Sequence, residues 1–351
     1  MPAGLVVVAV STAVALSPTA VTAAPSPLAQ ACQKAEIPVG LLLHKKTPLI
    51  GPDCDLRGKV IRAHPMLAVV VPADNEGVRA HLLLDETVVL NDQPDYLGVD
   101  VVEGDVAVAV QEDVGDDAIL PDASTDTKTE PDPSPDSVEV KPEGFSTLAS
   151  VECSQTAYNL KDVYNGYHKW YFAKDTVPSY FNKDLAEKDV RAGAYNIDVG
   201  YNDCGLTQSM GTDLAYGGFT FDGADINSDG TCNARDGKNV AAFGYSSSWT
   251  RLATACTWTS WRYGPDYIIE GDIEFNNGSN RFFYYLPSGC SDRYELQGVA
   301  THEFGHIFGL GHVSEQYYPR MTMSPIATAC SYSDKSLGRG DWQGLRKRYG
   351  A

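Results

Sequence analysis

Apolar residues divide the chain into a strand-rich first part and a mixed second part. Between about 32 and 115, short apolar runs are separated by Pro, Gly, Asn and Asp, which is typical of β-strands joined by turns. The strands expected in the first part are 67–71, 87–90 and 106–110. Those expected in the second part are 170–172, 240–243, 252–258 and 267–275.

Three segments of the second part have the spacing of helices instead. Residues 182–201 carry apolar side chains close to helical spacing, 294–309 predicts another helix, and 337–349 a short closing helix followed by Gly350. Strands mixed with a few helices predict an α+β domain preceded by a small β-rich domain.

The N-terminus has the pattern of a secretory signal peptide. Residues 3–24 carry no charge, and small residues follow a short apolar core. A membrane anchor or a buried strand is less favoured, because the core is short and Pro18 interrupts it. The absence of Lys or Arg before the core is atypical. We therefore predict a signal peptide at 1–24, a secreted protein, and no stable membrane insertion after signal cleavage.

The two parts of the chain also differ in net charge. The 351 residues carry a formal net charge of -19, of which -14 falls on residues 1–143 and -5 on residues 144–351. Such an acidic chain does not favour a nucleic-acid partner. Two parts with such different balances are not expected to form one continuous domain.

An acidic, proline-rich segment lies between the two parts. Residues 121–143 contain five Pro and seven Asp or Glu, with few large apolar groups. Such a segment cannot bury enough surface to offset its ordering entropy. We expect a disordered linker at 119–148, open to proteolysis, between an acidic β-rich domain at 25–118 and a C-terminal domain at 149–351.

The eight cysteines predict disulfide bonds. No Cys-x-x-Cys pair occurs, and an even number of dispersed cysteines in an exported chain favours disulfides. Two cysteines fall in the acidic part and six in the C-terminal part, so each part can pair internally.

The segment 302–312 carries the chemistry. His302 and His306 are four residues apart, so on a helix they lie on one face, one turn apart. Gly309 lets the chain turn out of the helix, and His312 can then return toward the same point. Three imidazoles leave a fourth position for water, which is the geometry of a catalytic zinc site. Glu303 can take a proton from that water as general base and return it to the leaving amine. A chance cluster on a structural helix is far less favoured, because only seven histidines occur in the whole chain.

This segment resembles the zinc motif of the metzincin endopeptidases, His-Glu-x-x-His-x-x-Gly-x-x-His. That family also has a methionine-containing turn beneath the metal. Met323, before Ser-Pro, is the better match to it, and Met321 is the second choice.

Within the metzincins the chain looks most like the matrixins, over roughly residues 160–350. The segments 272–276 and 336–341 resemble the matrixin strand before the zinc helix and the start of the last helix. The resemblance implies a metzincin-like fold with a twisted mixed sheet, a zinc helix and a C-terminal helix. It also implies a substrate strand along 252–257 and a specificity-pocket wall after Met323. A bacterial origin is one reading of the looser match.

The sequence lacks the feature that keeps the proenzymes of animal matrixins inactive. Their propeptide supplies a zinc-binding cysteine in a Pro-Arg-Cys-Gly type segment, and none occurs here. Cys54 is flanked by Asp53 and Asp55, which disfavour a thiolate. A Cys32–Cys54 disulfide is therefore favoured over a Cys54 zinc lock.

A second metal site is predicted in a loop. Residues 225–236 place oxygens at calcium-loop spacing with Gly at position six, although position twelve is Asp rather than Glu. The alternative is a plain Asp/Asn/Gly turn, which the lack of a clear flanking helix pattern slightly favours. The candidate Ca²⁺ ligands are Asp225, Asn227, Asp229 and Asp236.

Together these features predict a secreted zinc endopeptidase made as a proenzyme, acting on protein or peptide substrates and masked by its propeptide in cis. Two alternatives stay open. One is a secreted binding protein stabilised by zinc, against which an intact Glu303 argues. The other is a peptidase whose N-terminal domain is a permanent targeting module. The aromatic residues Trp249, Trp258, Trp261 and Tyr263 could line a substrate cleft, but such residues more often fill a core or an interface.

Overall fold

The computed structural model describes residues 24–52, 54–88, 94–110, 152–164, 166–261, 267–278 and 281–350. The predicted linker and the predicted signal peptide, apart from Ala24, lie outside these residues. Within the described residues no helix is long and apolar enough to cross a membrane.

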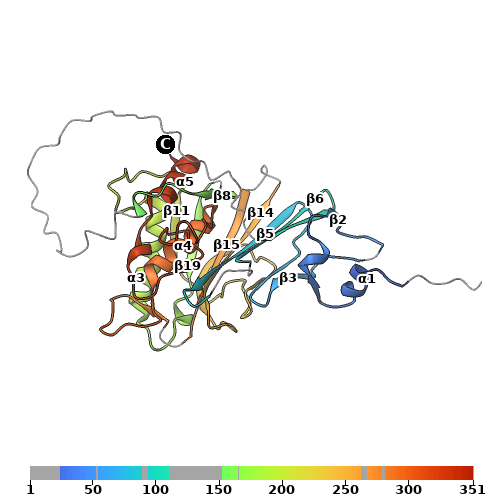
Figure 1. The fold of residues 1–351 in the computed structure, drawn as a ribbon, viewed down its shortest axis with the longest axis horizontal. Coiled ribbons are helices and arrows are strands. Elements are labelled where there is room, and N and C mark those ends of the chain that lie inside the picture. The colour runs from blue at the N-terminus through green and yellow to red at the C-terminus, as the bar shows by residue number, and fades with distance from the viewer. Residues whose placement is uncertain are drawn as a thin grey trace, which may run out of the picture.

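One mixed sheet of eleven strands runs through both parts of the chain (Figure 1). Its main path has the order β11-β10-β13-β15-β14-β5-β6-β7-β2, with β19 beside β5 and β9 beside β15. The C-terminal part supplies β9 (Val163–Tyr164), β10 (His168–Phe172), β11 (Leu214–Phe219), β13 (Asn239–Gly244), β14 (Arg251–Ser260), β15 (Tyr267–Asn276) and β19 (Ile326–Ala327). The N-terminal part supplies β2 (Thr47–Pro48), β5 (Glu76–Asp85), β6 (Tyr96–Val102) and β7 (Asp105–Val110).

The two parts join where β5 pairs antiparallel with β14 along most of both strands. A smaller four-stranded sheet also crosses the boundary, because β12 (Thr231–Cys232) pairs with β4 (Leu67–Val70). Its other strands are β1 (Glu36–Pro38) and β3 (Val60–His64). The predicted acidic domain thus shares sheets with the C-terminal part.

Short elements complete the sheets. Two-stranded pairs form between β16 (Phe282–Phe283) and β17 (Tyr294–Glu295), and between β18 (Leu310–Gly311) and β8 (Asn159–Leu160). The short helices are the α-helix α1 (Pro27–Cys32) and the 3₁₀ helices η1 (Val39–Leu41), η2 (Lys174–Thr176) and η3 (Ser333–Lys335).

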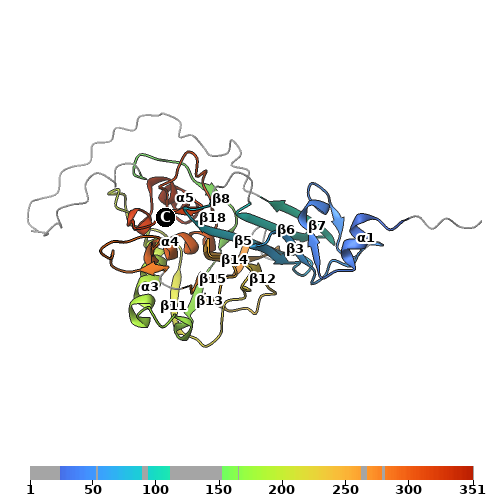
Figure 2. The ribbon, with the colours of Figure 1, turned by 60° about the horizontal axis from the view of Figure 1, so that its bottom comes forward.

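The three predicted helices are confirmed as α3 (Lys183–Val199), α4 (Leu296–Ile307) and α5 (Arg339–Tyr349). The Asn182 side chain caps α3 by accepting from two backbone N–H groups, and Gly200 ends it in a left-handed conformation. The three helices lie together at the C-terminal end of the molecule, whereas α1 and β3 lie at the other end (Figure 2).

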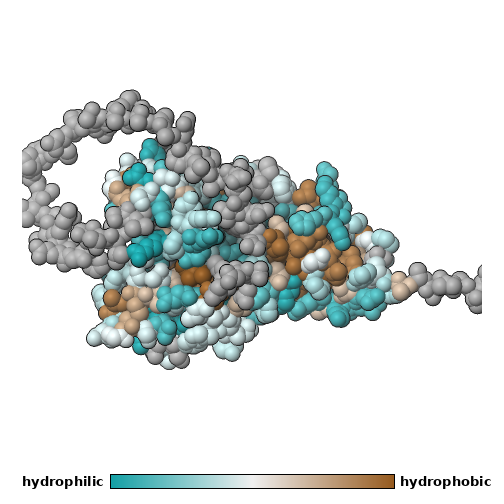
Figure 3. Space-filling model, in the orientation of Figure 1, coloured by the Kyte–Doolittle hydropathy of each residue, from teal (hydrophilic) through white to brown (hydrophobic). Residues whose placement is uncertain are grey.

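Two hydrophobic cores follow this arrangement. The first lies among α3, α4 and the C-terminal strands, and the second is built mainly on the N-terminal strands. Neighbouring residues of β5 enter different cores, because successive side chains of a strand point to opposite faces: Leu83 joins the first core, and Leu82 and Leu84 join the second. Figure 3 shows hydrophobic residues gathered over the N-terminal part in that view.

All eight cysteines are paired, and each part pairs internally as predicted. The bonds are Cys32–Cys54, Cys153–Cys204, Cys232–Cys256 and Cys290–Cys330. The favoured Cys32–Cys54 disulfide is therefore confirmed, and it leaves no Cys54 thiol to lock a metal.

Candidate metal centre and substrate cleft

The buried face of α4 carries two of the predicted metal ligands. The Glu295 side chain caps the helix by accepting from the Gly298 N–H at 2.6 Å. His302 and His306 then lie one turn apart, each about 1% exposed, with their Nε2 atoms 2.9 Å apart. This closeness follows directly from their i, i+4 spacing.

A glycine turn brings in the third histidine. Gly309 has a φ of 78°, and a Cβ there would fall 1.8 Å from the Asp162 carbonyl oxygen, so a larger residue does not fit. The chain then forms β18 and places His312 Nε2 at 3.1 Å from His302 Nε2 and 3.0 Å from His306 Nε2. The structure thus gathers all three predicted ligands at one point.

The hydrogen bonds of the His302 and His306 rings show which ring nitrogen is free to bind a metal. The Nδ1 of His302 contacts the Thr322 carbonyl at 2.7 Å, and the Nδ1 of His306 contacts the Leu310 carbonyl at 2.8 Å. A carbonyl only accepts, so each Nδ1 carries the proton and each Nε2 presents a lone pair. Burial, together with the neighbouring histidines, lowers the pKa of both rings well below the usual value, which keeps them neutral.

Neutral imidazole nitrogens turned toward one another in a buried site need a cation between them. Tetrahedral zinc with Zn–N bonds of about 2.0–2.1 Å requires nitrogens about 3.3 Å apart. The observed separations are close to this value, so these residues fit zinc.

Glu303 lies in α4 directly after His302 and is fully buried. Within the described part of the chain, neither of its carboxyl oxygens has a hydrogen-bond partner. Burial raises its pKa well above the usual range, and the Arg251 guanidinium opposes that shift. A buried carboxyl group without a partner is costly for stability and is typical of a functional group.

Met323, the residue expected in the methionine turn, packs against α4. A Cβ on Gly305 of α4 would fall 2.5 Å from the Met323 sulfur, so glycine permits this close packing. Met321 packs elsewhere, in a small cluster with Ala157 and Val313. Between the two methionines, the Thr322 carbonyl holds His302.

The predicted substrate strand is covered. β14 includes the expected segment 252–257, and its edge is paired antiparallel with β5. On its other side β5 pairs in parallel with β19, which belongs to the predicted pocket wall after Met323. The Leu83 side chain lines a pocket together with His302, Val299 and Ile326. A segment of the N-terminal part therefore lies where an extended peptide is expected.

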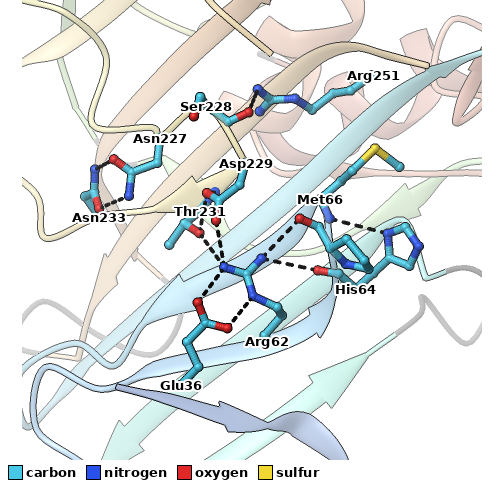
Figure 4. A network of polar contacts seen from close by, with 11 residues as sticks. Glu36, Arg62, His64, Met66, Asn227, Ser228, Asp229, Thr231, Asn233 and Arg251 are labelled. Carbon is cyan, nitrogen blue, oxygen red and sulfur yellow. Dashed lines mark hydrogen bonds and ion pairs between the residues drawn. The ribbon is translucent and has the colours of Figure 1, made fainter. Parts of the chain in front are cut away.

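The predicted calcium ligands have different partners (Figure 4). Asp229 forms an ion pair with Arg62 at 2.7 Å, and Asn227 exchanges side-chain hydrogen bonds with Asn233. Arg62 belongs to β3 of the N-terminal part and also forms an ion pair with Glu36. Its ion pair with Asp229 therefore connects this loop to the N-terminal part.

Asp225 instead lies with two carboxylates of β15. Oxygens of Asp225, Glu270 and Asp272 come within 4.8 Å of one another. Burial raises the pKa of Glu270 to about 7 and that of Asp272 well above its usual value. Asp236 is close by, because its backbone N–H donates to Glu270 Oε1 at 3.1 Å. Sequence spacing did not reveal the two β15 carboxylates.

The candidate aromatic residues have separate roles. Trp258 is buried in the N-terminal core, whereas Trp249 is half exposed and stacks over the Arg281 guanidinium at 4.6 Å. Tyr263 lies outside the described residues. The aromatic group therefore provides no common cleft lining among the described residues.

Two residues of the N-terminal part reach the histidine cluster and had no sequence signal. His81 of β5 stacks on the His306 ring at 4.0 Å between centroids, and Asp95 Oδ2 lies 3.3 Å from His312 Nδ1. His81 is embedded in an apolar run, and Asp95 is one of many acidic residues. The pairing of β5 with β14 brings His81 to the site, and the pairing of β6 with β5 brings Asp95, which directly precedes β6.

Comparison with known proteins agrees with the geometry. Residues 219–350 match the Matrixin peptidase family model. The chain is also 33% identical to matrilysin of Rattus norvegicus over 88 residues, which is 25% of this chain and 30% of that protein. The chain thus matches under a third of the length of that relative. Residues 219–350 are therefore similar to a matrixin domain.

Proposed function

We propose that the chain is a secreted zinc endopeptidase made as a proenzyme, with His302, His306 and His312 as zinc ligands and Glu303 as general base and acid. The observation that carries the proposal is the convergence of three buried Nε2 atoms within 3.1 Å. Two of them belong to α4, which also carries Glu303, and the Glu303 carboxyl oxygens have no hydrogen-bond partner among the described residues. When bound, zinc would polarise the scissile carbonyl and acidify a water molecule.

The chain's own residues supply the rest of the reaction. Glu303 accepts the proton of the attacking water on a carboxyl oxygen and later donates it to the leaving amine nitrogen. The β14 edge holds the substrate backbone in an extended conformation through main-chain hydrogen bonds. Met323 supports the histidines from below. Protein and peptide substrates are therefore the expected partners.

The N-terminal part acts as a propeptide in this proposal. Since β5 takes the edge of β14 that a substrate needs, its release is a condition for activity. Cleavage within the predicted linker 119–148 would allow this release. A permanent targeting module has no need to enter the catalytic sheet.

Calcium remains the second proposed cofactor. Asp225 would bind it, and the nearby carboxyl groups of Glu270 and Asp272 are more suitable partners than Asp229, which Arg62 neutralises.

The alternative of a zinc-stabilised binding protein predicts a different outcome for one substitution. In protein activated by cleavage of the linker, Glu303→Gln should retain one zinc per chain and lose casein hydrolysis by at least about a hundredfold. Glu187→Gln on α3 is the matched control and should keep both properties. If Glu303→Gln hydrolyses casein like the parent protein, the proposed role of Glu303 is wrong.

A further inference from the structure

The pocket beside His302 has a wall that comes from the segment after Met323, and Leu83 of β5 lies against it. The wall residues are Ser324, 326–328, Ser331, Asp334 and Lys335. The regular structure of this wall is short, since β19 and η3 span two and three residues. The shape of the pocket therefore depends on what attaches the wall to its neighbours.

β5 holds one side of the wall in the uncleaved chain. β19 pairs with β5 in a register that places Ile326 beside Leu84, and the Leu84 N–H donates to the Pro325 carbonyl at 2.9 Å. The Ala329 N–H donates to Glu86 Oε2 at 3.1 Å. All three contacts are lost when β5 leaves, as the proposed activation requires.

The other side of the wall is attached to the start of α4. Cys330 forms a disulfide with Cys290, and its backbone N–H donates to the Arg293 carbonyl at 2.8 Å. Arg293 directly precedes β17, which leads without a break into α4. The Tyr332 hydroxyl also accepts from the Leu286 N–H at 2.6 Å. None of these three contacts involves β5, so they can persist after its release.

The covalent bond is the strongest of these attachments. The hydrogen bond between Leu286 and Tyr332 is exposed, where water competes for both groups. Cys330 has a φ of 55°, in the left-handed region that residues other than glycine rarely adopt. A conformation of this kind persists where its surroundings hold it in place. The turn at Cys330 therefore depends on a firm connection.

We propose that the Cys290–Cys330 disulfide is a positioning element that keeps the pocket beside His302 formed after β5 has left, an inference that rests on the proposed function. In the uncleaved chain, β5 and the disulfide hold the wall from two sides. In the activated protein, the disulfide holds the wall around Cys330 while a substrate side chain takes the place of Leu83.

The position of the wall decides how well a large side chain binds. Leu83 fills the pocket and leaves only about 20 Å³ of space, so the wall is in close contact with a side chain of this size. A wall that moves away loses contacts with leucine, whereas alanine is too short to make them. Loss of the disulfide should therefore reduce the preference for leucine over alanine.

Kinetics of the full-length protein after cleavage of the linker test the proposal. A peptide library read by mass spectrometry first identifies the substrate position at which the parent protein prefers leucine most strongly. At this position the parent should favour leucine over alanine by at least about tenfold in kcat/KM. In Cys290→Ser/Cys330→Ser the preference should fall below about threefold, through a higher KM for the leucine peptide with kcat within about twofold.

Cys153→Ser/Cys204→Ser is the matched control, because it also removes one disulfide of the C-terminal part and neither residue lines the pocket. It should keep the preference of the parent. All three proteins should contain one zinc per chain, so that a damaged metal site is not mistaken for a changed pocket.

A second variant covers the case in which the first does not fold. In Cys290→Ser/Cys330→Gly the new glycine adopts the left-handed conformation without strain, and the same fall in preference is expected. If neither variant folds, the disulfide is a general requirement for folding, and its role as a positioning element is wrong.

The outcomes separate this proposal from the proposed function. An unchanged preference for leucine without the Cys290–Cys330 bond, or an equal fall in the control, would overturn the positioning role while the peptidase stands. The same holds for a parent that hydrolyses casein but does not distinguish leucine from alanine at any position. A cleaved parent that binds no zinc or cuts no peptide contradicts the proposed function itself.

Discussion

A buried ion pair between β5 and the C-terminal part provides a sharp test of how firmly the proposed propeptide is held. Asp85 and Arg281 are each 1% exposed, and their charged atoms lie 2.7 Å apart. Replacing Asp85 by Ala leaves the guanidinium buried without its counter-ion, which typically costs about 3–5 kcal/mol. Because about 1.4 kcal/mol is a factor of ten, β5 should open roughly a hundred to several thousand times more often.

The remaining contacts of Arg281 favour the lower end of that range. Its guanidinium also lies over the Trp249 ring at 4.6 Å and the Tyr294 ring at 5.1 Å, and these cation–π contacts survive the substitution. We therefore expect an increase in opening of about two powers of ten.

Native-state hydrogen exchange measures this opening directly. The amides that join β5 to β14 should exchange about a hundredfold faster in full-length Glu303→Gln/Asp85→Ala than in Glu303→Gln, because exchange follows the local opening free energy. Asp175→Ala removes an exposed ion pair with Lys183 and should have no measurable effect. A change below about threefold in the Asp85 variant would refute the reasoning.

Two further predictions concern a side chain of β5 and a buried carboxyl group. Leu83→Ala removes three carbons from a pocket with only about 20 Å³ of remaining cavity, so docking of β5 should weaken by about 2–5 kcal/mol. When linker-cleaved protein is titrated with urea and release of the N-terminal part is recorded, the variant should have a lower urea midpoint. An unchanged midpoint would contradict this prediction. Burial raises the pKa of Asp341 from its ordinary 3.8 to about 7, so its contribution to stability is complete below about pH 4 and is lost as the pH rises through 7. Urea unfolding should therefore show a free energy of unfolding that declines from pH 5 to 8, and Asp341→Asn should reduce this decline. An equal decline in both proteins would exclude Asp341 as its source.

The helices and the histidine cluster could be predicted because their signals are local. The apolar spacing of 182–201 and 294–309 is fixed by the turn of the helix, and α3 and α4 appear within those ranges. The positions of His302, His306 and His312 follow from the helical repeat and from a glycine that permits a left-handed turn. Disulfide pairing within each part also followed from the distribution of the cysteines.

The junction of the two parts could not be predicted, because it depends on pairing between distant segments. β5 and β14 are far apart in sequence, and the sequence of one strand does not determine which other strand its backbone pairs with. The difference in charge between the two parts indicated separate units, whereas backbone hydrogen bonds join them in one sheet. The role of Asp229 changed for the same reason, since its partner Arg62 comes from the other part.

Casein hydrolysis by the full-length protein, recorded before and after cleavage of the predicted linker in one preparation, tests the central claim most directly. We predict no hydrolysis while β5 covers β14. Hydrolysis should begin after cleavage and release of the N-terminal part, and a zinc chelator should stop it. Full activity before cleavage would contradict the proposed masking. A cleaved, folded, zinc-containing protein without any peptidase activity would contradict the proposed function.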